Sequence, residues 1–140
     1  LERRVAASMP DFRAALTSRD EPAFWLFSSG TTGRPKAIIH SHGNCAQGGK
    51  LLREVVRADE NAVVLGTSKF FFTYSLDNAF LGPLSLGATT IVIESWPEPE
   101  QVAEAVARHR PNVVFSVPTF YRRLLGLGAE GLSALRSVAQ

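Results

Sequence analysis

Short apolar segments rich in β-branched residues alternate with segments of helical periodicity through most of the chain. Apolar runs of this kind predict buried strands. We expect three of them at residues 62–66, 89–93 and 113–117. Strands that alternate with helices are typical of β-α units. The sequence therefore predicts an α/β fold of stacked β-α units on a largely parallel sheet.

Start and stop signals mark the helices between these strands. Pro83 is expected to bend one helix, which Gly87 ends, and Pro118 suits the first turn of another. We expect helices at 44–56, at 77–86, from 97–100 up to Pro111, and at 118–125. Residues 135–139 are expected to begin one further strand.

The N-terminal residues differ in character from the rest. Pro10 follows Ser8, and apolar residues then recur at helical spacing up to the polar stretch 17–21. We expect a helix and linker over 1–22, followed by one unit over 23–140 that holds a glycine-rich loop and the β-α core.

The glycine-rich loop lies between two predicted strands, 23–28 and 36–41. Residues 27–36 read Phe-Ser-Ser-Gly-Thr-Thr-Gly-Arg-Pro-Lys. Gly30 and Gly33 let successive backbone N–H groups point at an anion. The neighbouring residues add hydroxyl donors and an ammonium group: Ser28, Ser29, Thr31, Thr32 and Lys36. This composition suits a polyphosphate.

Two other interpretations fit parts of this loop sequence. An ordinary glycine-rich turn has the same composition, because Gly, Ser, Thr and Pro are common turn residues. A Walker A loop needs Gly-Lys-Ser/Thr running straight into a helix, whereas here Pro35 precedes Lys36 and a strand is expected next. The Walker A interpretation is therefore rejected.

Composition narrows the class of protein. The chain has 140 residues, is 45% hydrophobic and carries a formal charge of +2, which fits one globular domain. Its basic pairs, Arg3 with Arg4 and Arg122 with Arg123, are isolated, so no nucleic-acid partner is expected. No apolar run approaches the roughly 20 residues that span a bilayer, so no membrane partner is expected either. We expect a cytoplasmic location.

Several single residues are of types that often have a function, but none of them supports a functional site here. Cys45, the only cysteine, permits no internal disulfide and is expected to be buried and inert. His40 and His42 share a strand face, but two ligands without a third rarely hold a metal, so no metal site is expected. Trp25 and Trp96 are expected to be packing residues.

Residues 28–36, followed by Ala-Ile-Ile-His-Ser-His-Gly-Asn at 37–44, resemble the signature of the adenylate-forming superfamily. This superfamily contains acyl-CoA synthetases, luciferases and peptide-synthetase adenylation domains. Ala37 departs from its usual glycine. Residues 68–78 and 118–121 resemble the benzoate–CoA ligase branch. The resemblance covers nearly the whole chain.

The resemblance implies an ATP-dependent ligase. In this family ATP and a carboxylic acid give an acyl-adenylate and pyrophosphate, and coenzyme A then takes the acyl group. The residues expected to hold the β- and γ-phosphates are Ser28, Ser29, Gly30, Thr31, Thr32, Gly33 and Lys36. Magnesium would bridge the phosphates, but the family's magnesium-holding glutamate and catalytic lysine have no match here. No catalytic residue or metal ligand is therefore expected in the chain.

The resemblance also implies an aromatic substrate. Phe72, Thr73 and Tyr74 match the segment that lines the aryl pocket, and Phe72 falls where many relatives carry a gating histidine. Ser75 and Asp77 replace usual glycines, and Asp77 puts an anion near an anionic substrate. The preceding Phe70 and Phe71 are expected to be core residues.

These observations predict an internal piece of the large N-terminal domain of a longer, bacterial acid–CoA ligase, inactive alone. Its expected partners are a small carboxylic acid, ATP and coenzyme A, with self-association possible through exposed strand edges. Two alternatives stay open: a peptide-synthetase adenylation domain that loads a carrier protein, and a nucleotide-binding module without catalysis.

Overall fold

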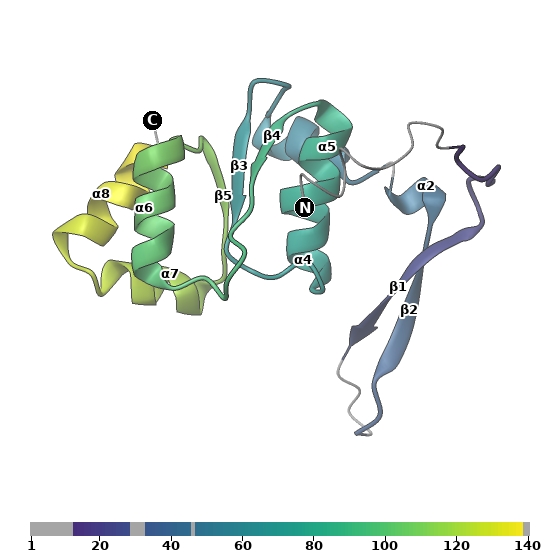
Figure 1. Cartoon of the computed structure of the whole chain (residues 1–140), viewed down its shortest axis with the longest axis horizontal. Coiled ribbons are helices and arrows are strands. Elements are labelled where there is room, and N and C mark those ends of the chain that lie inside the picture. Colours follow the sequence, from purple (N-terminus) through teal and green to yellow (C-terminus); the bar gives the residue numbers. More distant parts are fainter. Residues whose placement is uncertain (1–12, 29–32, 46, 139–140) are drawn as a thin grey trace, which may run out of the picture.

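The computed structural model describes residues 13–28, 33–45 and 47–138. Strands β1 (Pro22–Ser28) and β2 (Lys36–Ser41) form an antiparallel two-stranded sheet, and a separate three-stranded sheet has the order β4-β3-β5. Figure 1 shows the β1–β2 hairpin standing beside the larger α/β body.

The three-stranded sheet is parallel and has β3 at its centre. Strand β3 (Val63–Gly66) pairs with β4 (Thr89–Ile91) on one side and with β5 (Val113–Phe115) on the other. Val64 and Leu65 of the central strand are fully buried, because helices cover both faces of the sheet. The predicted α/β fold with a parallel sheet is confirmed, although each strand is shorter than expected.

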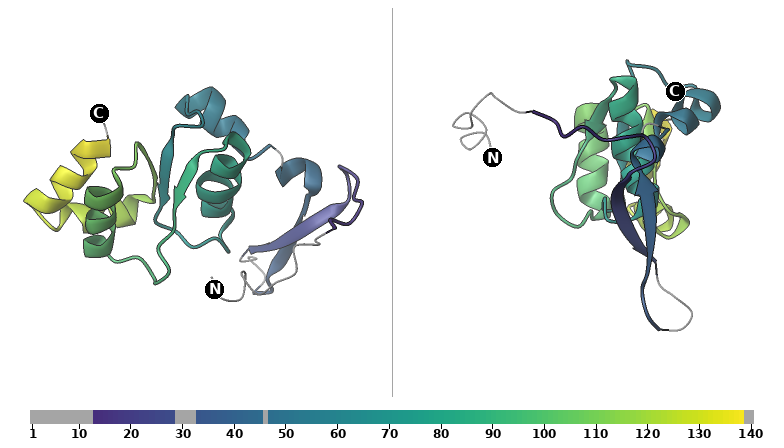
Figure 2. Two further views of the ribbon diagram at one scale, coloured as in Figure 1. Left: turned by 45° about the horizontal axis from the view of Figure 1, so that its top comes forward. Right: turned by 90° about the vertical axis from the view of Figure 1, so that its right-hand side faces the viewer.

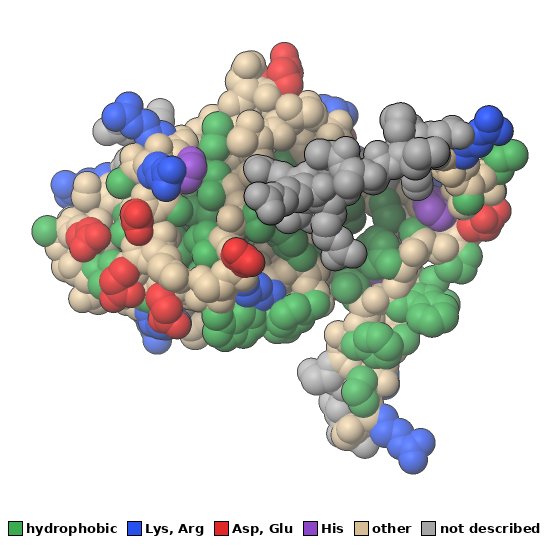
Figure 3. All heavy atoms as spheres, viewed as in Figure 1, with side chains coloured by type: hydrophobic (Ala, Val, Ile, Leu, Met, Phe, Trp, Pro, Cys, Tyr) green, Lys and Arg blue, Asp and Glu red, His purple; other side chains and the backbone are tan. Residues whose placement is uncertain are grey.

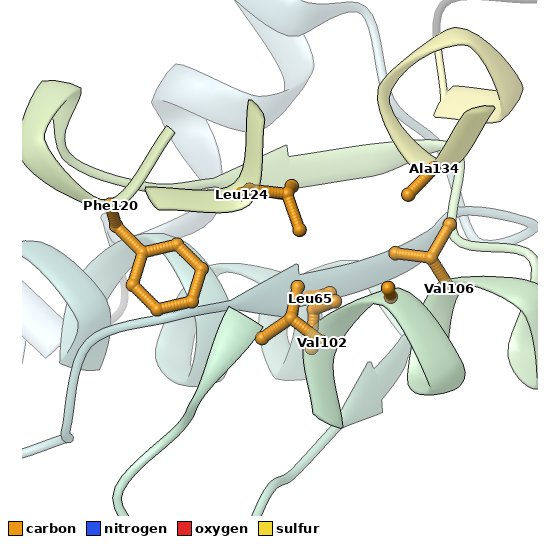
Figure 4. Packing of buried hydrophobic residues seen from close by; sticks show 7 residues of the cluster. Leu65, Val102, Val106, Phe120, Leu124 and Ala134 are labelled. Atoms are coloured by element: carbon orange, nitrogen blue, oxygen red, sulfur yellow. The ribbon is translucent and has the colours of Figure 1, made fainter. Parts of the chain in front are cut away.

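One face of the sheet packs against α6 (Pro99–His109), α7 (Pro118–Leu125) and α8 (Ala129–Val138). The buried cluster between them, shown in part in Figure 4, consists of Leu65, Val102, Ala103, Val106, Phe120, Leu124 and Ala134. Burying one such leucine, valine or phenylalanine stabilises a fold by about 1.5–3 kcal/mol. This side therefore holds the larger part of the core.

The other face packs against a continuous helical run that changes pitch. It consists of α4 (Thr73–Leu76), the π-helical η2 (Asp77–Leu81) and α5 (Gly82–Leu86). Pro83 lies at the start of α5, directly after the π-helical η2, and Gly87 ends the run with φ of 73°. The predicted end of the helix is confirmed, but its start lies earlier, at Thr73.

The helix expected at 44–56 is broken into pieces. These are α2 (His42–Cys45), α3 (Gly49–Leu51) and the π-helical η1 (Leu52–Val56). A Cβ at Gly48, just before α3, would lie 2.7 Å from Oδ1 of Asp77. The glycine thus lets this segment approach η2 closely.

Two predicted elements differ from the structure. Residues 135–138 belong to α8 and not to a strand, because residues 131, 134, 135 and 138 turn toward the core at helical spacing. At the N-terminus, residues 13–18 are not helical, and the rest of the expected helix lies outside the described residues.

The left view of Figure 2 shows the β1–β2 hairpin at one end of the molecule, and Figure 3 shows large apolar side chains on the surface of the hairpin. Trp25, Phe27 and Ile39 are 60%, 68% and 59% exposed. Trp96, in the segment after β4 of the three-stranded sheet, is also 60% exposed. The expectation that both tryptophans are packing residues is therefore wrong for the described chain. No helix within residues 13–28, 33–45 and 47–138 has the length and apolarity to cross a bilayer.

Candidate functional site

The glycine-rich loop connects two strands that pair with each other. Ser28 and Lys36 are register partners at the loop end of the hairpin, and both are exposed. Gly33 has φ of 78°, a conformation that other residues rarely adopt. The predicted strand–loop–strand arrangement is confirmed, and the remaining loop residues, Ser29, Gly30, Thr31 and Thr32, lie outside the described part of the chain.

The end of β2 leads into a short helix. Ser41 accepts a hydrogen bond at its Oγ from the Asn44 backbone N–H, at 3.3 Å, and its carbonyl accepts one from the Cys45 thiol, at 3.4 Å. His42 begins α2 and is exposed. His40 is half-buried, with its ring stacked on Phe24 at a centroid distance of 4.9 Å. In the described residues no three His, Cys, Asp or Glu side chains gather as metal ligands would.

The side chains of the three predicted pocket residues point in different directions. Phe72 precedes α4 and lines a hollow with Trp96, while Thr73 lines a cavity beside the hairpin. Tyr74 turns toward β5, where its hydroxyl donates to the Ser116 carbonyl at 3.3 Å. Consecutive helical residues are about 100° apart, so three in a row rarely share one wall.

The cavity that Thr73 reaches lies between the hairpin and the α4–η2 run. Its volume is about 120 Å³. Apolar and polar side chains line it: Phe24, Leu26, His40, Asn44, Cys45, Thr73, Leu76, Asp77 and Leu81. Burial raises the pKa of the Asp77 carboxyl, and the neighbouring His40 opposes this by lowering it. An acid and an imidazole thus face one small enclosed space.

The hollow that Phe72 reaches is larger and more open. Its volume is about 300 Å³, and Thr67 and Phe120 also line it. Lys69 lies at the edge of this hollow. Its ammonium group donates hydrogen bonds to the carbonyls of Ile93, Glu94 and Ser95. The same group lies 5.8 Å from the ring centroid of Trp96.

The two phenylalanines before Phe72 have different environments. Phe70 packs against the buried cluster of Ala62, Val64 and Ala79, so its predicted core role is confirmed. Phe71 is 63% exposed and lies 6.0 Å from the ring of Trp96, so the same prediction is wrong for Phe71.

A buried hydroxyl pair, which sequence reasoning missed, lies at the carboxyl edge of the sheet. The Oγ1 of Thr67 is 2.6 Å from the Oγ of Ser116, and both residues are buried. Tyr74 donates to the backbone carbonyl of Ser116 itself, and Tyr121 donates to the carbonyl of Val114, two residues earlier in the chain. Burial, and secondarily the nearby Tyr74, raises the pKa of Tyr121. The available signal was a hydroxyl residue directly after one predicted strand, Thr67, and another near the end of a second predicted strand, Ser116.

A family profile described as AMP-binding enzyme matches residues 2–139 of this chain. The chain belongs to the AMP-binding enzyme family. Among its relatives in this family is a 3-hydroxybenzoate–CoA/4-hydroxybenzoate–CoA ligase of Thauera aromatica, 45% identical over 85% of this chain and 23% of the relative.

Solved structures of AMP-binding enzymes give the same result. A benzoate–CoA ligase from Burkholderia xenovorans LB400 matches 89% of this chain with a TM-score of 0.77 and 36% identity. An anthranilate–CoA ligase in complex with anthranoyl-AMP matches 85% with a TM-score of 0.78 and 26% identity. The chain covers 24% and 23% of these two structures, and so spans about a quarter of the length of its relatives.

Proposed function

We propose that this chain is the phosphate-binding part of an ATP-dependent ligase that activates an aromatic, benzoate-like acid and transfers it to coenzyme A. The acid would first become an acyl-adenylate, with release of pyrophosphate. Residues 23–140 would form part of the ligase's N-terminal AMP-binding domain. The cytoplasmic location stays a prediction.

The observation that carries this proposal is the register of Ser28 and Lys36 across the β1–β2 hairpin. The pairing holds a hydroxyl and an ammonium group opposite each other at the mouth of the loop. Pairing of the two extended strands orders both backbones before a ligand binds, so that binding costs less conformational entropy. A loop anchored in this way is suited to orient a leaving pyrophosphate, for which positioning and charge stabilisation matter most.

Each residue of the loop has a proposed part in this task. Backbone N–H groups around Gly30 and Gly33 would face the β- and γ-phosphates. The hydroxyls of Ser28, Ser29, Thr31 and Thr32 would donate to phosphate oxygens, and Lys36 would neutralise charge. Magnesium, when bound to ATP, would add further charge neutralisation, and none of the described residues forms a cluster that could hold it alone.

The aromatic substrate is supported by the relatives and by the position of Thr73. The hydroxybenzoate, benzoate and anthranilate ligases named above all act on benzoate-like acids. Thr73 lines a cavity with several apolar walls, of a size that suits one aromatic ring. Phe72 and Tyr74 flank Thr73 in the chain and are proposed to close the pocket on either side.

The experiment uses the full-length protein that carries this sequence, with ATP, magnesium, benzoate and coenzyme A. We expect benzoyl-CoA, AMP and pyrophosphate in equal amounts. Lys36→Ala should lower kcat/KM for ATP about ten- to hundredfold, because one charge-assisted hydrogen bond is worth about 1.5–3 kcal/mol. Lys50→Ala removes an exposed lysine of α3 and serves as the matched control, with expected wild-type activity.

Two outcomes would contradict the proposal. Unchanged ATP kinetics in the Lys36→Ala protein would remove the loop from phosphate binding. Transfer of the acyl group only to a carrier-protein thiol, in a parallel assay without coenzyme A, would favour a peptide-synthetase type of adenylation domain. Calorimetry with ATP and magnesium distinguishes a third class: binding without pyrophosphate release would indicate a non-catalytic module.

A further inference from the structure

Asp77 and Thr73 line the same cavity from one helical run, and His40 lines it from the hairpin. We propose that this cavity receives the far end of the aromatic ring and that Asp77 accepts a hydrogen bond from a ring hydroxyl there. The enzyme would then select hydroxy-substituted aromatic acids. This inference rests on the proposed function, since it takes the ligand of the cavity to be the acid that is activated.

The size and walls of the cavity suit part of one ring. A dry protein cavity of about 150 Å³ binds benzene. The cavity here measures about 120 Å³, so it can hold most of a ring while the carboxyl end extends outward. Four of its walls are apolar, namely those formed by Phe24, Leu26, Leu76 and Leu81.

The carboxylate of Asp77 has unused acceptor capacity. Asp77 begins η2 and is half-buried, and within the described residues its side chain accepts no hydrogen bond. An ionised carboxylate has about four lone-pair sites, so Asp77 can accept a hydrogen bond from a ligand without losing a protein partner. Burial correspondingly raises the pKa of this carboxyl. A neutral phenolic hydroxyl supplies the missing donor without adding charge.

His40 faces the same space with a fixed orientation. Its ring stacks on Phe24 with an interplanar angle of 10°, and both residues are register partners across the hairpin. The imidazole partly offsets the rise in the pKa of Asp77 that burial causes. Asp77 on η2 and His40 on β2 together form one polar region in a cavity whose other walls are mostly apolar.

Charge decides which end of the substrate enters. The substrate is itself a carboxylate, and two like charges in a partly buried space repel strongly. The carboxyl end must therefore point away from Asp77, so the opposite part of the ring enters the cavity. A hydroxyl in the meta or para position can then reach Asp77, whereas an ortho hydroxyl remains beside the reacting carboxyl group.

The test measures kcat/KM of the full-length protein for benzoate, meta-hydroxybenzoate and para-hydroxybenzoate. For wild type we expect at least one hydroxy acid to be preferred over benzoate. In Asp77→Ala we expect that preference to fall about tenfold or more, since a hydrogen bond to a charged group is lost. The value for benzoate, which has no hydroxyl group for Asp77 to bind, should fall less than the values for the hydroxy acids.

Two further variants keep the result interpretable. Asp77→Asn preserves the side-chain volume and should lose part of the preference, so it decides the question where the alanine variant does not fold. Glu104→Ala removes an exposed carboxylate of α6, outside the cavity, and should keep the wild-type preference.

Equal losses for benzoate and the hydroxy acids in both Asp77 variants would overturn the inference and leave the ligase function standing. A preference unchanged in both variants would do the same. A wild-type protein that forms no thioester from any of the three acids would instead overturn the proposed function, and this inference with it.

Discussion

The hydroxyl groups of Thr67 and Ser116 lie 2.6 Å apart, buried where β3 and β5 end. The Thr67 backbone N–H also donates to the Phe115 carbonyl at 3.0 Å, so the two strand ends are joined by both backbone and side chains. Tyr74 donates to the Ser116 carbonyl from α4. The pair therefore ties the carboxyl edge of the sheet to the helix that begins beside it.

Thr67→Val should destabilise the protein by about 1–3 kcal/mol, because the Ser116 hydroxyl would be left buried without its partner. The double variant Thr67→Val with Ser116→Ala removes both hydroxyls and should regain part of that loss. Urea unfolding of the two single variants and the double variant measures this coupling. Strictly additive losses would mean that the two hydroxyls do not interact.

Gly66→Ala should destabilise the protein by about 1–3 kcal/mol through overpacking. An added Cβ at Gly66 would lie 2.5 Å from the Cβ of Ala79 and 2.8 Å from the Oγ of Ser75. Combining it with Ala79→Gly should therefore recover part of the stability.

Gly87→Ala provides the comparison for Gly66. A Cβ at Gly87 meets no described atom within 4 Å, but φ is 73°, so its cost of about 1–2 kcal/mol comes from backbone strain alone. Ala79→Gly should give this variant no recovery. Urea unfolding of wild type, the two glycine variants and their two combinations with Ala79→Gly separates overpacking from backbone strain. Equal recovery of stability by Ala79→Gly in the Gly66→Ala and Gly87→Ala proteins would refute the packing argument.

Asp77→Asn should make the protein more stable at neutral pH. The pKa of Asp77 is raised above its ordinary value of 3.8, so the folded state binds this proton more tightly than the unfolded state. Stability from this group is therefore present below pH 3.8 and is lost as pH rises through the folded pKa. The advantage of the asparagine variant should shrink as pH falls from neutral through the folded pKa, and should level off below 3.8. Urea unfolding across this range tests the sign, and an advantage that grows at acid pH would contradict it.

Lys69→Met should loosen the segment after β4 and destabilise the protein by about 1–2 kcal/mol, because three carbonyl groups lose their charged donor. The lysine also lies against the Trp96 ring, so the emission of this tryptophan should change. A Trp25→Phe background leaves Trp96 as the remaining tryptophan of the chain. An unchanged spectrum and unchanged stability would show that the lysine contacts have no net effect.

Much of the fold could be predicted because local signals and tertiary packing agree. Pro118 marks the start of α7, and the alternation at 36–41 gives β2 its observed bounds. The strand expected at 135–139 failed because a short apolar run fits a buried strand and a buried helix equally well. Gly128, with φ of 67°, allows the turn into α8, and packing against the α6–α7 side then decides for a helix.

The candidate site was predictable as composition but less so as geometry. The hydroxyls, glycines and lysine around the loop follow from residue types, whereas the antiparallel partnership of Ser28 with Lys36 is a pairing that no local pattern specifies. The resemblance predicts that Phe72, Thr73 and Tyr74 line the aryl pocket, and the helix that begins at Thr73 turns their side chains in different directions. The meeting of His40 with Asp77 joins residues from separate elements, and only the packed chain brings them together.

The β2 strand works as a spacer of fixed length. Lys36 marks one end beside the loop, and His40 marks the other beside the cavity. An extended chain advances about 3.3 Å per residue, so the two positions are held roughly 13 Å apart. This separation changes only in whole residues, and inserting or deleting one would turn His40 and its neighbours to the opposite face. A slightly longer or shorter substrate can therefore be accommodated only by changes in the side chains of the α4–η2 run that line the cavity.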